Sequence, residues 1–170
     1  MTFKDFFKGF FHTTYGKILV SMLTTLFVIF VFNMFFVVVS GSSMEPTYHN
    51  MQIVPVKSTL FSSDICRNDV VIVRIDGKRL IKRVVGLPGE TVTISNGRVY
   101  INGELLLENY DDIYNPGLLR NQPLVLDKNE YFLLGDNRNC SSDSRVFGPV
   151  KKPRITHVVK ISKKSEEGKH

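Results

Sequence analysis

The feature that most constrains this chain is an uninterrupted apolar segment near its N-terminus. From Ile18 to Ser43 no residue is charged, and Asn33 is the only strongly polar residue before Val39. A helix over residues 18–39 would be about 33 Å long, against roughly 30 Å for the hydrocarbon core of a bilayer. We therefore predict a membrane-spanning helix over 18–39, the alternative being a buried core helix.

The flanks of this segment distinguish an anchor from a cleaved export signal. A secretory signal has an apolar run of only about 7 to 15 residues followed by a small-residue cleavage site, and neither is present. Lys4, Lys8 and Lys17 lie on the N-terminal side. The positive-inside rule therefore places residues 1–17 in the cytoplasm and the chain after about residue 40 on the other side of the membrane.

The net charge of +6 is concentrated at the two ends of the chain. Three lysines precede the apolar segment, and residues 150–170 contain most of the remaining excess of Lys and Arg. The middle of the chain is close to neutral, so a basic recognition face is not expected and no nucleic-acid partner is predicted. A hydrophobic content of 43% with 22% charged residues excludes a disordered chain.

The cysteines and histidines of the sequence predict neither a metal site nor a disulfide framework. Cys66 and Cys140 are too few for a disulfide framework and are not spaced as a zinc cluster, and the four histidines form no His-Glu-x-x-His pair. We expect no metal and no other cofactor. Outside the cytoplasm the two cysteines could pair with each other, or both could remain buried free thiols.

Beyond the apolar segment, short runs rich in β-branched and aromatic residues alternate with Gly, Pro, Asn or Asp, which predicts a mainly β, antiparallel domain. Asn96-Gly97 and Asn102-Gly103 indicate hairpin turns. Residues 105–125, with two prolines and weak periodicity, are interpreted as a long loop or flap. The predicted strands are 52–57, 69–75, 80–85, 91–94, 98–101, 131–134 and 155–161.

Three polar stretches are not explained by turn formation alone: 40–47, 80–90 and 135–145. In the second, Lys82 shares a strand face with Leu80 and Val84, while Ile81 and Arg83 point to the opposite face. Burial would lower the pKa of this lysine from about 10.4, and a neutral lysine near pH 7 to 8 is a competent general base. Taken alone, the stretch is better explained by a lysine whose head group reaches water.

Together the three stretches resemble the type I signal peptidases, membrane-bound Ser/Lys proteases that remove signal peptides from exported proteins. The runs S-M-x-P-T from residue 43, K-R-V-x-G-x-P-G-E from 82 and G-D-N-R-x-x-S-x-D-S-R from 135 occur in the family's order and spacing. The resemblance covers about residues 40–150 and implies a barrel-like catalytic β domain. It also implies a single-pass protein of the cytoplasmic (inner) membrane whose partners are the lipid bilayer and the signal peptides of preproteins.

The resemblance assigns roles to particular residues. It implies that Ser43 is the nucleophile, that Lys82 is the general base, and that Ser141 hydrogen-bonds and orients the lysine. Arg83, on the strand face opposite Lys82, is expected to pair with a carboxylate. The other residues that match the family's supporting charges are Asp136, Arg138, Asp143 and Arg145.

The oxyanion donors are only partly assigned. The backbone N–H of Ser43 is the first expected donor. One branch of the family has a second donor in a serine two residues before the nucleophile, but Gly41 occupies that place here, as in another branch. Ser42 and Ser40 remain as candidates for the second donor.

Substrate binding is expected to follow the family pattern. An extended peptide would add as a strand beside the segment leading into Ser43 and the strand ending at Lys82, with small residues one and three positions before the cut. Phe35, Phe36, Val37 and Val39 would line its pockets or lie in lipid.

The predicted domains are a cytoplasmic N-terminus over 1–17, an anchor over 18–39, an extracytoplasmic catalytic β domain over 40–162 and a mobile basic tail over 163–170. Two alternatives remain for the function. One is a specialised processing peptidase of the same clan, for a conjugation pilus or an organellar inner membrane. The other is a non-catalytic anchored scaffold, which the retention of Ser43, Lys82 and Ser141 disfavours.

Overall fold

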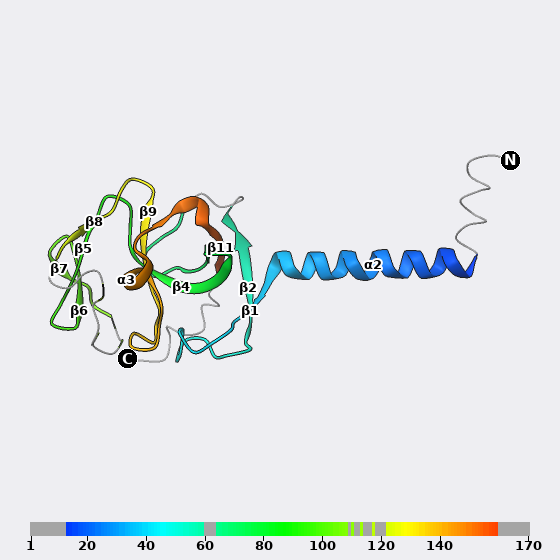
Figure 1. Ribbon diagram of the computed structural model, residues 1–170, viewed down its shortest axis with the longest axis horizontal. Coiled ribbons are helices and arrows are strands. Elements are labelled where there is room, and N and C mark those ends of the chain that lie inside the picture. Colours follow the sequence, from blue (N-terminus) through cyan, green and yellow to red (C-terminus); the bar gives the residue numbers. More distant parts are fainter. Residues whose placement is uncertain are drawn as a thin grey trace, which may run out of the picture. The chain divides into compact units, whose positions relative to one another are not determined.

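The computed structural model describes residues 13–59, 64–108, 110, 113, 117 and 122–159. Its contacts divide the chain into two compact units, Met1–Phe36 and Val37–His170. The first contains a helix and the second contains the β-sheets (Figure 1). The predicted tail over 163–170 lies outside the described residues.

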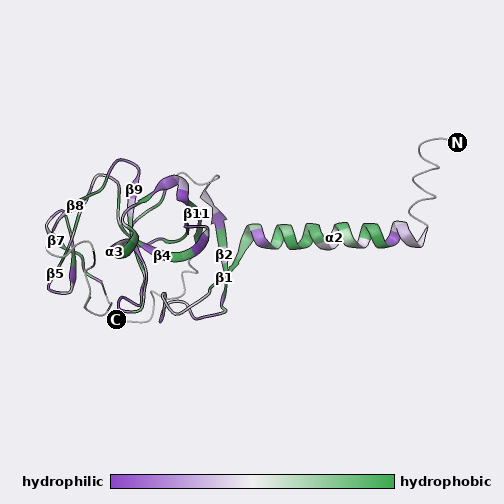
Figure 2. Cartoon of the chain, viewed as in Figure 1, coloured by the Kyte–Doolittle hydropathy of each residue, from purple (hydrophilic) through white to green (hydrophobic). Residues whose placement is uncertain are grey.

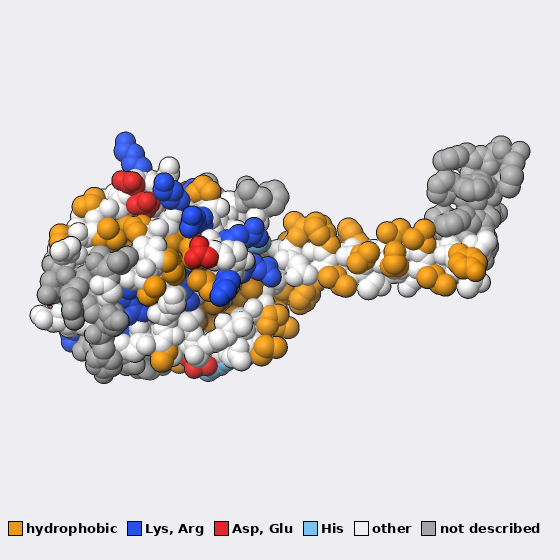
Figure 3. Space-filling model, viewed as in Figure 1, with side chains coloured by type: hydrophobic (Ala, Val, Ile, Leu, Met, Phe, Trp, Pro, Cys, Tyr) orange, Lys and Arg blue, Asp and Glu red, His pale blue; other side chains and the backbone are white. Residues whose placement is uncertain are grey.

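The apolar segment forms helix α2, Thr14–Phe35. Thr13 caps its N-terminus, because the side-chain oxygen accepts a hydrogen bond from the backbone N–H of Gly16 at 3.1 Å. The helix has 22 residues and is long and apolar enough to cross a membrane. Figure 2 shows hydrophobic residues along most of its length, and Figure 3 shows their side chains on its surface.

Polar side chains within α2 are satisfied by the helix itself. Asn33 donates from Nδ2 to the carbonyl oxygen of Ile29 at 2.8 Å, and Thr25 donates to the carbonyl of Ser21 at 2.8 Å. Such bonds to the preceding turn remove most of the cost of placing these groups in a hydrocarbon environment. The single amide therefore needs no partner helix.

The predicted span of 18–39 is wrong at both ends as a helix. The helix begins four residues earlier and ends at Phe35, after which Phe36–Val38 form strand β1. The valines at 37–39 are β-branched and favour an extended backbone. The backbone bonds from Val39 N to Gln52 O and from Met51 N to Val39 O, both 2.8 Å, then tie this segment to the next strand.

Among the described residues, seven strands form the larger sheet, in the order β1-β2-β11-β3-β4-β9-β10 (Figure 1). Its central pairs are antiparallel, and Val71 of β3 lies directly opposite Lys82 of β4. The register between β3 and β4 is unbroken because the two strands are joined by the short Asp76-Gly77 turn. The other strand bounds are Ile53–Ser58 (β2), Val70–Ile75 (β3), Lys78–Gly86 (β4), Glu130–Leu134 (β9), Val150–Lys151 (β10) and Ile155–Val159 (β11).

A smaller sheet has the order β7-β6-β5-β8. Figure 1 shows these strands grouped apart from β1, β2 and β11. The two predicted hairpin turns are confirmed, because Asn96-Gly97 and Asn102-Gly103 have positive φ angles at both residues. The bounds are Thr91–Ser95 (β5), Arg98–Ile101 (β6), Glu104–Leu105 (β7) and Leu124–Val125 (β8).

The structure confirms the mainly β, antiparallel prediction and finds a strand at each of the seven predicted places, with most bounds within one or two residues. The predicted end of the last strand, at residues 160–161, lies outside the described residues. The short strands β7, β8 and β10, helix α3 (Ser144–Phe147) and the 3-10 helix η3 (Lys152–Arg154) were not predicted. They are too short to carry a periodic pattern. Two of them, β7 and β8, include the two ends of the segment interpreted as a flap.

Buried hydrophobic residues fix the polar stretch 40–47 to the larger sheet. Val39 and Met44 are buried in one cluster with Ile72 of β3 and Ile81 of β4. Full burial of a side chain the size of Met contributes about 2 to 3 kcal/mol. Because Met44 follows Ser43 directly and has no exposed surface, its burial fixes the position of the serine.

Candidate active site

Ser43 lies in a turn between strands β1 and β2. Gly41, two residues before it, has a φ of +91°, a left-handed conformation that glycine adopts at no steric cost, and its N–H donates to Asn50 Oδ1 at 2.9 Å. On the other side, the backbone N–H of Asn137 donates to the carbonyl oxygen of Ser43 at 3.1 Å. The loop after β9 therefore holds the main chain of Ser43 in place.

Lys82 reaches Ser43 from the middle of β4. Its Nζ lies 2.8 Å from Ser43 Oγ and donates to the carbonyl oxygen of Ile81 at 2.9 Å. Only 2% of the lysine is exposed. Burial lowers the pKa of this amine from 10.5 to about 8, against the opposing effect of the Asp143 and Asp136 carboxylates.

This geometry suits proton transfer between the two side chains. Near pH 8 about half of the amine is neutral, and its lone pair can then accept the proton of the Ser43 hydroxyl. A nucleophile and base pair normally needs a third group that orients the base. Here the carbonyl oxygen of Ile81 accepts a hydrogen bond from the amine, a contact that the sequence did not suggest because any residue carries such a group.

Ser141 is placed differently from its prediction. Its Oγ is buried and has no hydrogen-bond partner among the described residues, so the expected bond to Lys82 is not formed. A Cβ added at Gly135 would lie 2.2 Å from Ser141 Oγ and 2.5 Å from the Ser43 carbonyl oxygen. Ser141 thus packs beside the main chain of Ser43, while the amine contacts Ser43 and Ile81.

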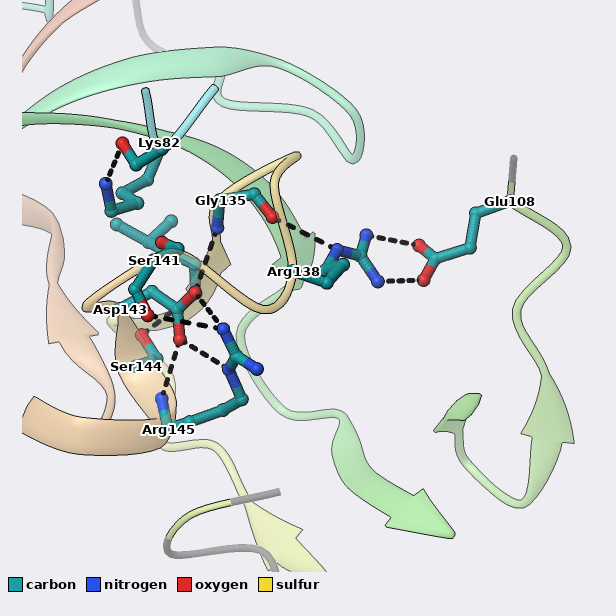
Figure 4. Close-up of polar contacts among 10 residues, drawn as sticks. Lys82, Glu108, Gly135, Arg138, Ser141, Asp143, Ser144 and Arg145 are labelled. Atoms are coloured by element: carbon teal, nitrogen blue, oxygen red, sulfur yellow. Dashed lines mark hydrogen bonds and ion pairs between the residues drawn. The ribbon is translucent and has the colours of Figure 1, made fainter. Parts of the chain in front are cut away.

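The predicted charged residues come together in buried pairs. Arg83 donates to both oxygens of Asp136, at 2.7 Å from Nε and 2.6 Å from Nη2, which confirms the expectation that it pairs with a carboxylate. Arg145 binds both oxygens of Asp143 at 2.8 Å. Asp143 also accepts the N–H of Gly135 at 3.0 Å and caps helix α3, so this carboxylate organises the loop after β9 (Figure 4).

Arg138 binds a residue that the sequence reasoning missed. It contacts Glu108 with both terminal nitrogens, the Nη2–Oε2 distance being 2.8 Å (Figure 4). Glu108 follows β7, in the segment interpreted as a flap. A single sequence offers no signal that would pair these two residues across thirty positions.

A cleft of about 360 Å³ lies beside the serine and the lysine. It is lined by residues 37–40 on one side and 78–82 on the other, with Ser43 and Ile72. Val37 and Val39 are among the residues that line the cleft, and Phe35 and Phe36 are not among its described lining residues. Of the two candidates for a second oxyanion donor, Ser40 lines the cleft and Ser42 does not.

One strand edge faces this cleft without a partner. Residues 78–82 of β4 pair with β3 on one side, while β9 pairs only with residues from Arg83 onward. Among the described strands, the second edge of β4 is therefore open beside Lys82. An extended peptide could bond to that edge.

The two cysteines match neither of the alternatives considered for them. Cys66 and Cys140 are both free, and both are exposed rather than buried.

A serine hydroxyl held against a buried amine beside a cleft is an arrangement suited to nucleophilic catalysis. The family model described as signal peptidase, peptidase S26 matches residues 12–162. The chain therefore belongs to this family.

Individual relatives agree with this assignment. The chain is 37% identical over 118 residues to signal peptidase I S of Bacillus subtilis (strain 168), a match that covers 64% of each chain. It is 36% identical over 136 residues to signal peptidase I V of the same strain, covering 71% of this chain and 80% of the relative. A solved signal peptidase I from Enterococcus faecalis V583 is 35% identical, covers 58% of this chain and 98% of its own, and has a TM-score of 0.49.

Proposed function

We propose that the protein is a membrane-anchored serine endopeptidase that cleaves signal peptides from exported preproteins after small residues. Ser43 is the nucleophile and Lys82 the general base. The observation that carries the proposal is the 2.8 Å contact between Lys82 Nζ and Ser43 Oγ, made by an amine that is almost fully buried. Membership of the signal peptidase family supports the substrate class.

The reaction is acyl transfer in two steps. Ser43 Oγ attacks the scissile carbonyl as its proton moves to Lys82 Nζ, and the protonated amine then donates that proton to the leaving peptide nitrogen. A water molecule, deprotonated by the same amine, hydrolyses the ester to release the second product. Both steps need the amine to be neutral at the start, which its lowered pKa allows near pH 8.

The developing oxyanion needs donors in the cleft. The backbone N–H of Ser43 is the first, as the sequence predicted. We assign the second to the hydroxyl of Ser40, because Ser40 lines the cleft. Ser42 instead presents its carbonyl oxygen to Asn137 Nδ2, at 3.3 Å.

The substrate binds as an added strand beside residues 78–82 of β4. Main-chain bonds to that open edge give affinity, and alternate side chains of the peptide point into the cleft. Val37, Val39 and Ile72 make part of the cleft lining apolar, and small apolar side chains of the peptide are expected to bind there. This accounts for cleavage after residues such as Ala.

The charged residues support the site without touching substrate. Arg83 pairs with Asp136 and Arg145 pairs with Asp143. Both carboxylates raise the pKa of the nearby lysine, while Arg145 and, above all, burial lower it. Arg138 binds the Gly135 carbonyl. Ser141, with an unpartnered hydroxyl beside Ser43, has a free donor that can turn to the amine when the reaction moves Lys82.

The chain is anchored by helix α2, with residues 1–17 in the cytoplasm and the β unit outside it. The charge-free stretch from Ile18 onward and the lysines on its N-terminal side support this orientation. Reporter fusions after residue 12 and after residue 159 should report opposite sides of the membrane. Equal reporter signals on one side would contradict the topology.

The test uses full-length protein in detergent with a purified preprotein and sequencing of the product's new N-terminus. The proposal predicts one cut after a small residue, and its loss in Ser43→Ala and Lys82→Met with circular dichroism unchanged. A folded wild-type protein that leaves every preprotein of a varied panel intact would instead indicate a scaffold. Cleavage of one preprotein alone would indicate a specialised processing peptidase.

A further inference from the structure

A cluster of five polar side chains joins three separate segments next to the site. It consists of Arg83 from β4, Glu108 and Tyr110 from the segment after β7, and Asp136 and Arg138 from the loop after β9. We propose that Glu108 and Tyr110 are positioning residues that hold the loop after β9 against Ser43, so that the rate of acyl transfer depends on them. The rate prediction rests on the proposed function.

Arg138 is the centre of the cluster. It is 2% exposed, and its guanidinium group contacts Glu108, Gly135 and Tyr110. Two nitrogens bind the Glu108 carboxylate, Nε donates to the Gly135 carbonyl oxygen at 3.1 Å, and the plane lies 4.4 Å from the centre of the Tyr110 ring. Figure 4 shows Glu108 approaching Arg138 from a segment far from the loop that carries the arginine.

Tyr110 lies near two cations at once. In addition to the contact with Arg138, the guanidinium carbon of Arg83 is 5.7 Å from the centre of the Tyr110 ring. Burial raises the pKa of the Tyr110 hydroxyl, and Asp136 raises it further, so the phenol stays neutral at working pH. With two arginines and two carboxylates the cluster has no net charge, which makes its burial tolerable.

The cluster is connected to the nucleophile through the loop after β9. Arg138 fixes the carbonyl of Gly135, and Asn137 between them donates its N–H to the carbonyl oxygen of Ser43. The atoms around Gly135 are closely packed, since even an added Cβ at this residue would meet Ser43 and Ser141. A shift of Arg138 would therefore be transmitted to the serine.

Loss of Glu108 would release this arrangement. A buried guanidinium without its carboxylate is strongly unfavourable, so Arg138 would turn toward water and leave Gly135. The described residues that line the cleft include neither Glu108 nor Tyr110. Substrate binding should therefore survive while the alignment of Ser43 with Lys82 suffers, and a displacement of about 1 Å can cost about 100-fold in rate.

The test compares Glu108→Gln and Tyr110→Leu with a control, Glu104→Gln. Glu104 is an exposed glutamate of β7, the strand that precedes Glu108 in the chain. We expect kcat to fall about 10- to 100-fold in the first two with KM within about threefold, and both constants to stay within about twofold in the control. Glu108→Asp should recover part of the loss. Wild-type kcat in folded Glu108→Gln and Tyr110→Leu, or an equal loss in the control, would overturn the proposal.

A second readout does not depend on activity. Hydrogen exchange of the Asn137 amide should accelerate at least about tenfold in Glu108→Gln and in Tyr110→Leu, and not in Glu104→Gln. If the wild type cleaves nothing, the proposed function fails and this exchange measurement still decides whether the cluster holds the loop. Unchanged exchange in both variants would contradict the proposal.

Discussion

Arg83 binds the carboxylate of Asp136, one of the two carboxylates whose charge raises the pKa of its neighbour Lys82. Lys82 and Arg83 are adjacent in β4, and the alternation of side chains along the strand sends them to opposite faces. Arg145 forms an ion pair with the second carboxylate, Asp143. Burial outweighs the effect of both carboxylates on the lysine, and its pKa falls to about 8.

Replacing Arg145 with Met should raise the pKa of Lys82, because Asp143 would then act on the amine without compensation. The rising limb of kcat/KM against pH should move from about 8 to higher pH. The free energy of unfolding should fall by about 3 to 5 kcal/mol, since a buried carboxylate is left unpaired. A pH-rate profile that stays in place or moves to lower pH would argue against this cause.

Replacing Lys82 with Met should abolish cleavage and change how stability depends on pH. The folded state binds the lysine proton more weakly than the unfolded state, so this group lowers stability below about pH 8 and the penalty disappears as pH rises toward 10.5. Denaturant unfolding should show the wild type gaining about 3 kcal/mol over that range relative to Lys82→Met. Parallel pH curves for the two proteins would show that the amine is not perturbed.

Adding a methyl group at Gly135 should remove activity more than stability. The new Cβ would meet the Ser43 carbonyl and Ser141 Oγ, so Ser43 or its loop must shift. Gly86→Ala is the matched control, since its Cβ would meet Val92, Leu126 and Phe132 in the core instead. Thermal unfolding and kcat should therefore rank the two variants in opposite orders, and a common order would show that Gly135 serves the fold alone.

Replacing Ser141 with Ala should not destabilise the protein. A buried hydroxyl without a partner costs about 1 to 3 kcal/mol, so its removal should leave the free energy of unfolding unchanged or raise it by about 1 kcal/mol. The rate should fall, because the same hydroxyl is proposed to assist Lys82 during the reaction. Chemical denaturation together with kcat measures both effects, and a clear loss of stability would mean that the hydroxyl has a structural partner.

The fold could be anticipated because its signals are local. Alternating β-branched residues and Asn-Gly turns predicted the strands of both sheets, and a charge-free segment predicted the helix. The end of that helix could not be read from hydropathy, because Val37 is as apolar as Leu26 and only the hydrogen bonds beside β2 make it a strand.

The site could be anticipated where residues stand in recognisable motifs, as Ser43, Lys82 and Arg83 do. Glu108 and Tyr110 were missed because their contacts arise from tertiary packing between segments that no pattern links. The position of Ser141 was also missed, since its motif gives a residue and not the direction of its hydroxyl.

The most direct test of the account is the titration of Lys82 itself by carbon-13 NMR of the side-chain Cε, assigned by loss of the signal in Lys82→Met. The account predicts a titration midpoint near pH 8 in the folded protein. A lysine that remains charged until pH 10 or above would contradict it.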